Sequence, residues 1–197
     1  MGFLKKIFGS DNSNNLTKTS EMLDENLYWQ IVQESLNNSG TQDGQQEYLV
    51  KRLQNLNPKD IVGFRLRTDK LLYDTYNSEM WCAGYIINGG CSDDGFEYFR
   101  NWVVSRGNDV YYKAKQNPDT LIEQVDEVAE FYEFEDFWYV ALKAFKNKTG
   151  KDLYDFIDDD NFKFKEGHYP NFDFTWEEEN PESMKAICPN LFDRMWK

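Results

Sequence analysis

The chain has 197 residues, 17% of them aromatic, and a formal net charge of −13. Because each aromatic ring can bury on the order of 150–250 Å², this composition excludes intrinsic disorder and predicts a packed core. Residues 117–197 carry 20 acidic residues against 9 basic ones, and no basic stripe offsets them, which argues against nucleic acid as a partner.

Residues 1–20 are predicted to be a flexible tail in front of a single helical domain over residues 21–197. Residues 9–20 are polar and low in complexity, as linkers are. The first eight residues are apolar apart from Lys5 and Lys6, so they either contact a membrane surface or form a frayed terminus. No run approaches the roughly 18 apolar residues of a membrane span. The three cysteines, an odd number, favour a reducing compartment, so we expect a cytoplasmic protein.

Four helices are predicted in the first half of the domain from apolar residues at helical spacing. The first ends at the polar run 37–40, and the second covers 43–55. The third starts at Asn57-Pro58, an N-cap followed by proline at the first helical position, and runs to about residue 76. The fourth, over 80–87, is apolar on every side, as a central buried helix is. It ends at Asn88-Gly89-Gly90, because glycine tolerates the left-handed backbone of a helix end.

The second half of the domain is predicted to be helical up to about residue 148. Ser92-Asp93-Asp94 supplies caps for a helix that runs to about Arg106. After Gly150 the pattern weakens into acidic sequence that contains Pro189. The remaining elements are helices at 108–116, 118–130 and 133–148, a stretch at 162–165 that alternates like a short strand, and an amphipathic piece near 180–196. The expected fold class is all-α, a compact multi-helix domain with an irregular acidic C-terminal part.

The sequence lacks the common metal and phosphate motifs. A single histidine excludes a His-x-x-x-His pair, and Cys82 and Cys91 are too far apart for a zinc knuckle. The acidic run 155–160 lacks the spacing and the glycine of a calcium loop. Gly90 stands where a phosphate-binding loop requires lysine. We therefore expect no metal and no cofactor, and whether the protein is an enzyme stays open.

The segment from Trp81 to Arg106 is the best candidate for a functional site. Helical spacing places Asp93, Glu97 and Arg100 on one face, beside the glycine corner. Two carboxylates and a guanidinium on a rigid element could bind a small polar ligand or a basic group of a partner. The alternative is that these charges pair within the helix, at roughly a few tenths of a kcal/mol per pair. The candidate residues are Trp81, Gly89, Gly90, Cys91, Ser92, Asp93, Asp94, Glu97 and Arg100.

The stretch WCAGYIINGGCSDDGFEYFRNW, residues 81–102, closely resembles the signature of the bacterial domain-of-unknown-function family 4240. The resemblance extends over roughly residues 21–197, and it implies a helical, bacterial, intracellular protein. The family carries no established activity, so the resemblance assigns no catalytic residue. Further similar features are Tyr28-Trp29, residues 57–64, residues 137–141, Lys148-Thr149-Gly150 and Trp176.

Two functions remain open from the sequence. The first is a binding or accessory protein that captures a cationic protein partner through the acidic C-terminal half. The second is an enzyme or small-ligand binder that uses the segment from Gly89 to Arg100. This second function predicts a pocket floored by Trp81, in which Arg100 is only partly used by intramolecular pairs.

Overall fold

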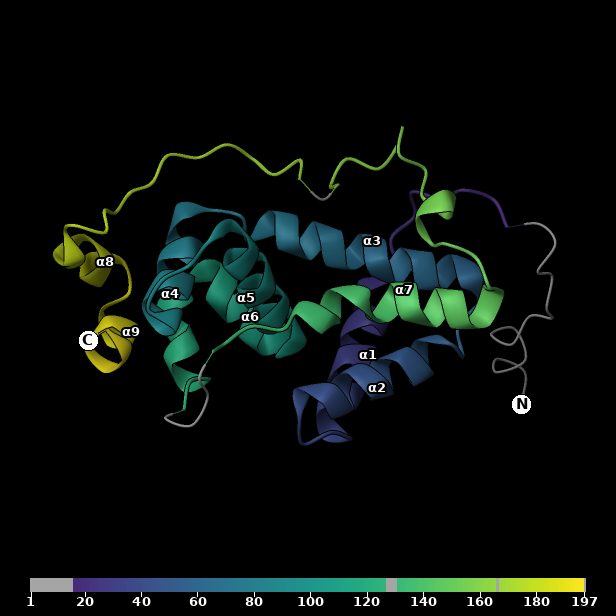
Figure 1. Cartoon of the computed structure of the whole chain (residues 1–197), viewed down its shortest axis with the longest axis horizontal. Helices are drawn as coiled ribbons and strands as arrows, with labels where there is room; N and C mark the ends of the chain where they lie inside the picture. Colours follow the sequence, from purple (N-terminus) through teal and green to yellow (C-terminus); the bar gives the residue numbers. More distant parts are fainter. Residues whose placement is uncertain (1–15, 127–130, 166, 197) are drawn as a thin grey trace.

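The computed structural model describes residues 16–126, 131–165 and 167–196. The prediction of an all-α fold is confirmed (Figure 1). The first eight residues, for which membrane contact and a frayed terminus were the two alternatives, lie outside the described part of the chain. The α-helices are α1 (Glu25–Asn37), α2 (Gln42–Leu53), α3 (Pro58–Asp74), α4 (Ser78–Asn88), α5 (Asp93–Ser105), α6 (Asn108–Gln116), α7 (Glu135–Thr149), α8 (Pro181–Ile187) and α9 (Pro189–Met195), and the 3-10 helices are η2 (Pro118–Glu123) and η3 (Tyr154–Phe156).

The helices begin at side-chain caps that the sequence contains. Asn57 accepts a hydrogen bond from the backbone N–H of Asp60 at 2.9 Å, and Pro58 occupies the first turn of α3, as predicted. Asn77 caps α4 in the same way, through the N–H of Met80 at 2.8 Å. Each cap satisfies a backbone N–H that has no partner inside the helix, which fixes where the helix begins.

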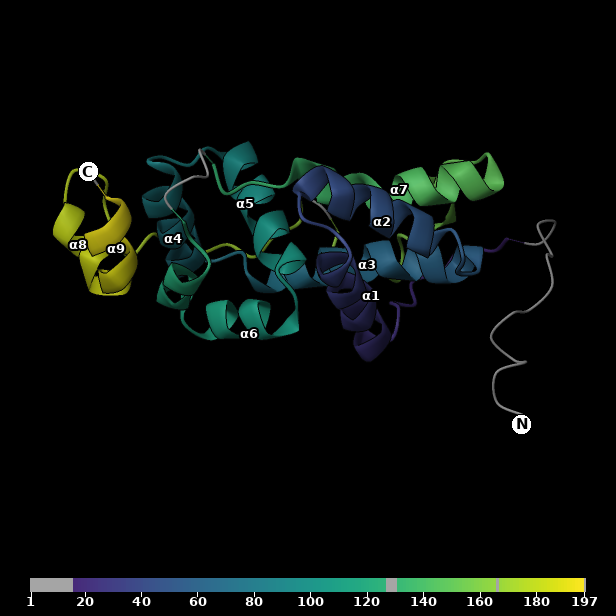
Figure 2. The same cartoon turned by 90° about the horizontal axis from the view of Figure 1, so that it is seen from below.

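The core is shared by helices that are far apart in the sequence. Helix α7 packs against α2, α3 and α5, and it runs beside α3 (Figures 1 and 2). At the opposite end, α8 and α9 pack against α4, and α9 also contacts η2 (Figure 2). The buried core between these helices combines aliphatic side chains with aromatic ones, among them Tyr28, Phe64 and Phe99.

Two predicted elements differ from the structure. Of the helix expected over 118–130, the described residues up to 126 form only the short η2. The Asp119 carboxylate at its start accepts from the Leu191 N–H at 2.9 Å, which ties this element to α9. The strand expected over 162–165 is not formed in the described chain, although Phe162 is buried and Lys163 exposed as the alternation predicts. The piece near 180–196 consists of two short helices separated at Cys188.

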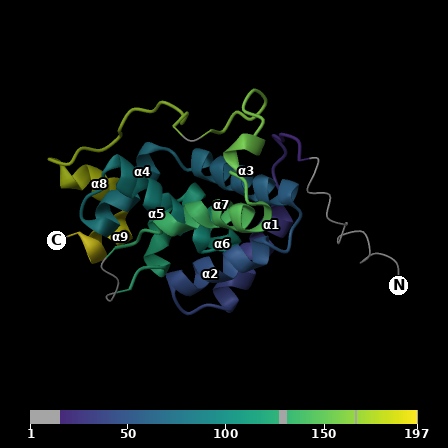
Figure 3. The ribbon, with the colours of Figure 1, turned by 45° about the vertical axis from the view of Figure 1, so that its right-hand side comes forward.

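An extended segment crosses one face of the helices and joins η3 to α8. We call its described residues, 159–165 and 167–176, the strap. It runs over α3 and α4 as the yellow-green trace in Figure 3. Just before it, the Asp158 N–H donates to the Thr19 oxygen at 3.0 Å, so contacts with the domain begin slightly before the predicted boundary at residue 21. The strap covers part of the segment that the sequence nominated as a site.

Candidate functional site

The glycine corner between α4 and α5 has the predicted form. Gly89 ends α4 with a left-handed backbone, φ +66°, and the Gly90 N–H donates to the Tyr85 oxygen at 2.9 Å. Gly89 is exposed, and a Cβ added at either glycine would meet no atom within 4 Å. The glycines are therefore required by the backbone turn and leave open space beside it.

The start of α5 presents acidic side chains to solvent at this corner. The Ser92 hydroxyl oxygen accepts from the Gly95 N–H at 3.1 Å and so caps the helix. Ser92, Asp93 and Asp94 are all exposed. The two carboxylates in the first turn of α5 are favoured there because the helix N-terminus carries partial positive charge.

Arg100 lies away from this acidic turn, in the interior. Its side chain is 1% exposed, and Nη1 donates to the Leu72 oxygen at 2.7 Å. Its Nη2 lies 4.0 Å from Glu97 Oε2, so the predicted pairing of these two residues is present. Asp93 is exposed and does not share this environment. The three residues predicted to share one face therefore lie in two environments. Asp93 is at the open corner, whereas Arg100 lies nearly two helical turns further along α5.

Aromatic rings enclose the Arg100 guanidinium. Its Cζ lies 4.6 Å from the ring centroids of Phe96 and Tyr169 and 4.9 Å from that of Tyr76. Tyr169 comes from the strap, stacks on Tyr76 at 4.3 Å and donates its hydroxyl to Glu97 Oε1 at 2.9 Å. Burial raises the Tyr169 pKa above its ordinary value, so this hydroxyl stays protonated. Sequence reasoning missed Tyr169, because no periodicity marks it within an irregular segment.

Trp81 and Cys91 complete the predicted set, and neither is arranged for catalysis. Trp81 is 8% exposed, stacks on Phe96 at 4.2 Å and donates its indole N–H to the Cys91 oxygen at 3.3 Å. Burial, reinforced by the nearby Glu133 carboxylate, raises the pKa of the Cys91 thiol to about 12. At neutral pH this thiol is protonated and therefore a poor nucleophile.

This raised pKa predicts a loss of stability at alkaline pH. The unfolded thiol loses its proton near pH 9, whereas the folded one keeps it until about pH 12. Between these values, ionisation stabilises the unfolded state, so the free energy of unfolding falls as the pH rises. This residue lowers the free energy of unfolding by at most about 1.4 kcal/mol per pH unit. Urea unfolding between pH 7.5 and 10.5 should therefore show a shallower decline for Cys91→Ala than for the unchanged chain. Equal slopes would contradict the assignment.

A second set of acids joins those of α5 at the corner. The Tyr132 N–H donates to Asn88 Oδ1 and the Phe134 N–H to the Tyr98 oxygen, both at 2.9 Å, which holds the segment before α7 against the corner. Glu133 consequently lies 3.3 Å from the position of a Cβ on Gly95. Burial, followed by the charge of Glu135, raises the pKa of Glu133.

Exposed rings accompany these carboxylates. Phe131 is 57% exposed and Tyr139 is 39% exposed, and Tyr98 of α5 is half-buried. Burial, then the charges of Glu135 and Asp94, raises the pKa of Tyr98, which indicates that these groups are close together. In the described chain, no Lys or Arg forms an ion pair with the carboxylates of Asp93, Asp94, Glu133 and Glu135. We call this surface the corner patch; its residues are Asp93, Asp94, Tyr98, Phe131, Glu133, Glu135 and Tyr139.

A separate cavity of about 200 Å³ lies under the strap, at a place that sequence reasoning did not nominate. Its wall includes Arg65 and Asp69, whose Nε and Oδ1 atoms are 2.9 Å apart, and His168 of the strap. The Arg65 guanidinium also stacks over Trp138 at 4.0 Å. Arg65 is buried, and the packing of α7 and the strap around α3 explains this burial.

The described residues offer no cluster of three or more His, Cys, Asp or Glu side chains that could hold a metal ion. In the same part of the chain, no helix is both long enough and apolar enough to cross a membrane.

Comparison with known proteins identifies the family. The model of the family described as protein of unknown function (DUF4240) matches residues 23–147, more than half of the chain. The chain belongs to this family. No curated protein and no solved structure matches it. The DUF4240 match contains the glycine corner and the corner patch, whereas the strap, α8 and α9 lie beyond its end.

Proposed function

We propose that this DUF4240 protein is a binding protein that captures a cationic segment of another protein on its corner patch. The observation that supports it most is the convergence of Asp93 and Asp94 of α5 with Glu133 and Glu135 of the following segment, without an ion pair in the described chain. Burial, followed by the charge of Glu135, raises the pKa of Glu133, and a partner's lysine and arginine side chains would relieve such repulsion between carboxylates.

The rings in the patch favour the same kind of partner. A lysine or arginine placed over an exposed aromatic face gains a cation–π attraction of about 0.5–1 kcal/mol, in addition to its attraction to a carboxylate. Phe131 and Tyr139 offer exposed rings beside the acids. The net negative charge of residues 117–197 adds a longer-range field that steers cationic partners toward the molecule.

The alternative function, an enzyme or small-ligand binder at the corner, gains no support from the predicted residues. Arg100 is engaged by the Leu72 oxygen, by Glu97 and by three rings, so its guanidinium is not directed toward the corner. The protonated Cys91 thiol offers no nucleophile. Protein binding therefore explains the geometry better.

A cytoplasmic location is part of the proposal. Cys82, Cys91 and Cys188 are free thiols in the structure, and the first and last of them are buried. Free thiols are typical of proteins in reducing compartments.

The proposal is tested by titrating a labelled peptide of alternating Lys-Gly and Arg-Ser units into the full chain and measuring fluorescence anisotropy. We expect saturable binding that weakens with added salt. Neutralising the patch, as Asp93→Asn, Asp94→Asn, Glu133→Gln and Glu135→Gln together, should weaken binding about tenfold, or roughly 1.4 kcal/mol.

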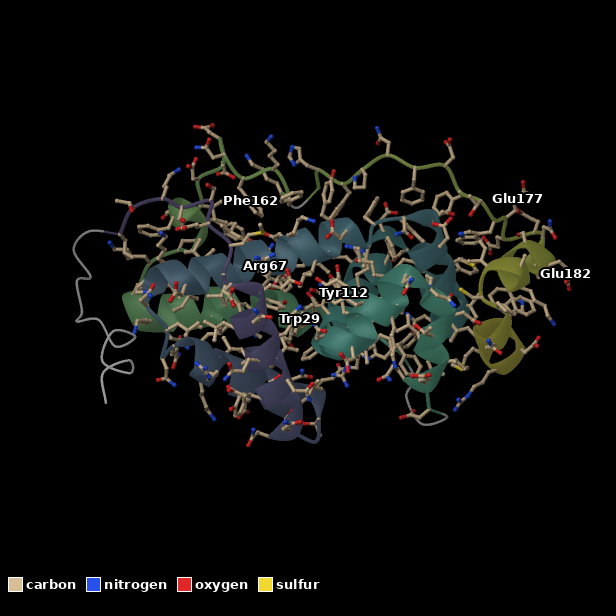
Figure 4. All side chains as sticks on the ribbon, turned by 180° about the vertical axis from the view of Figure 1, so that it is seen from behind. Trp29, Arg67, Tyr112, Phe162, Glu177 and Glu182 are labelled. Atoms are coloured by element: carbon tan, nitrogen blue, oxygen red, sulfur yellow. The ribbon has the colours of Figure 1, made fainter. Side chains whose placement is uncertain are left out.

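The matched control removes the same number of charges at the α8 end. Glu177, Glu178, Glu179 and Glu182 are exposed there, and Figure 4 shows the first and last of them at the far end of the strap. Their replacement by Gln should leave binding within about twofold of the unchanged chain, since it alters only the long-range field. If both quadruple variants weaken binding equally, the peptide responds to net charge alone and the corner patch is not a site.

A further inference from the structure

Aromatic residues occupy alternate positions along part of the strap, and their rings pack against the helices. Phe172, Phe174 and Trp176 occupy every second position, and the residues between them, Asp173 and Thr175, are exposed. Because successive side chains of an extended segment point to opposite sides, this spacing turns three rings to the same face. The strap therefore presents a row of rings to α4.

A matching row of side chains on the helices receives them. The Phe172 ring lies 5.5 Å from Tyr76, the Phe174 ring 5.4 Å from Trp81, and the Trp176 ring 5.1 Å from Tyr85. All three distances fall in the range of favourable aromatic pairs. We call Tyr76, Ser78, Trp81 and Tyr85 the receiving face; these residues follow one another along α4 and the turn before it.

Ser78 supplies the polar contacts of this face. Its hydroxyl oxygen accepts from the Thr175 N–H at 2.9 Å, and its backbone oxygen accepts from the Trp176 indole N–H at 3.0 Å. On α5, Glu97 Oε1 accepts a hydrogen bond from the hydroxyl of Tyr169 of the strap at 2.9 Å. These contacts fix both the position and the register of an extended segment, since each polar group is matched to one residue of it.

Few of the strap's hydrogen bonds to the helices come from its backbone. In its described residues, the Thr175 N–H is the backbone group that donates to a helix. Phe174 is still 53% exposed although it packs against Trp81. Trp176 is buried and Tyr169 contacts Arg100, so the strap is attached mainly through side chains, which another extended segment with equivalent side chains could replace. The receiving face lies inside the family match over residues 23–147, whereas the strap lies outside it.

The geometry points to the receiving face as a peptide-binding site. Its ligand is an extended segment of a partner protein that carries three aromatic side chains at alternate positions. The strap is the resident occupant, and a partner segment displaces it by taking the same ring contacts and the same hydrogen bonds to Ser78. The site is separate from the corner patch, and it binds aromatic side chains rather than cationic ones.

The test uses a fluorescent synthetic peptide of the strap's own sequence over residues 168–178, HYPNFDFTWEE. In the unchanged full chain, the tethered strap competes at a high effective concentration, so the free peptide should bind weakly. Loosening the strap by Phe172→Ala and Trp176→Ala in the full chain should strengthen peptide binding about tenfold. A peptide with the order HYPNFFDTWEE, which breaks the alternation, should bind about tenfold more weakly than the original.

A receiving-face variant and its matched control locate the site. Tyr85→Ala, added to the loosened chain, should weaken peptide binding about tenfold, because it removes the partner of Trp176. Tyr112→Ala removes an exposed ring on α6, which Figure 4 labels, and should leave peptide binding unchanged. Circular dichroism confirms that each variant is folded, and Trp176→Phe provides a milder loosening if the double variant is not.

Two results would overturn the inference. One is a folded, loosened chain that gains no affinity for the peptide. The other is a loosened chain that dimerises in light scattering and is not returned to monomer by the peptide, because the face would then serve exchange of straps between two copies. The basic peptide used for the corner patch should bind the loosened chain as before, which keeps the two proposals independent.

Discussion

Replacement of Arg100 by alanine is expected to lower the free energy of unfolding by about 3–5 kcal/mol. The change removes the shortest of the hydrogen bonds to the Leu72 oxygen, which keeps only the longer ones from Thr75. It also leaves Glu97 without a neighbouring cation and opens a space between three rings. Each of these effects is costly in a buried position, and here they act together. Urea unfolding followed by tryptophan fluorescence measures the loss.

Two further variants separate the causes. Arg100→Lys keeps the positive charge but loses the planar group that lies against the rings, so we expect a loss between those of the alanine variant and the unchanged chain. Lys113→Ala removes a cation that is 61% exposed and pairs with Glu123, and should change stability by less than about 0.5 kcal/mol. A loss of less than about 1 kcal/mol for Arg100→Ala would show that the guanidinium is dispensable to the core.

Local signals in the sequence were sufficient for most helix boundaries. The Asn57-Pro58 start and the Gly89 end are set by backbone chemistry within a few residues, and both lie where they were expected. The helix predicted after Pro118 shows where such signals fail. Its start is correct, but the Asp119 carboxylate binds the N–H groups of Asn190 and Leu191, a contact with α9 that no local pattern contains.

The candidate site was predictable only where it is local. Helical spacing correctly paired Glu97 with Arg100 and placed the exposed acids beside the glycine corner. It could not show that Arg100 is buried, because the ring that covers it, Tyr169, comes from the strap, 69 positions further along the chain. An irregular acidic segment carries no periodicity that would reveal which helices it crosses.

Replacement of Gly63 by alanine is the second change with a large expected effect. Gly63 lies within α3, and a Cβ there would meet the backbone of the segment that precedes α1, 2.8 Å from the Leu23 nitrogen and 3.1 Å from the Glu21 oxygen. The Leu23 N–H also donates to the Gly63 oxygen at 2.9 Å, so this segment cannot move away without losing the bond. Backbone atoms yield less readily than flexible side chains, and the clash must shift α3 or the segment.

We therefore expect Gly63→Ala to lower the free energy of unfolding by about 1–3 kcal/mol, even though alanine is the better helix former by about 1 kcal/mol. Gly40→Ala is the matched control, since a Cβ at Gly40 would meet no atom within 4 Å, and it should change stability by less than about 0.5 kcal/mol. Thermal unfolding of both variants decides the matter. If Gly63→Ala is neutral or stabilising, helix propensity outweighs the contact, and the close approach of the two backbones is not what requires glycine at this position.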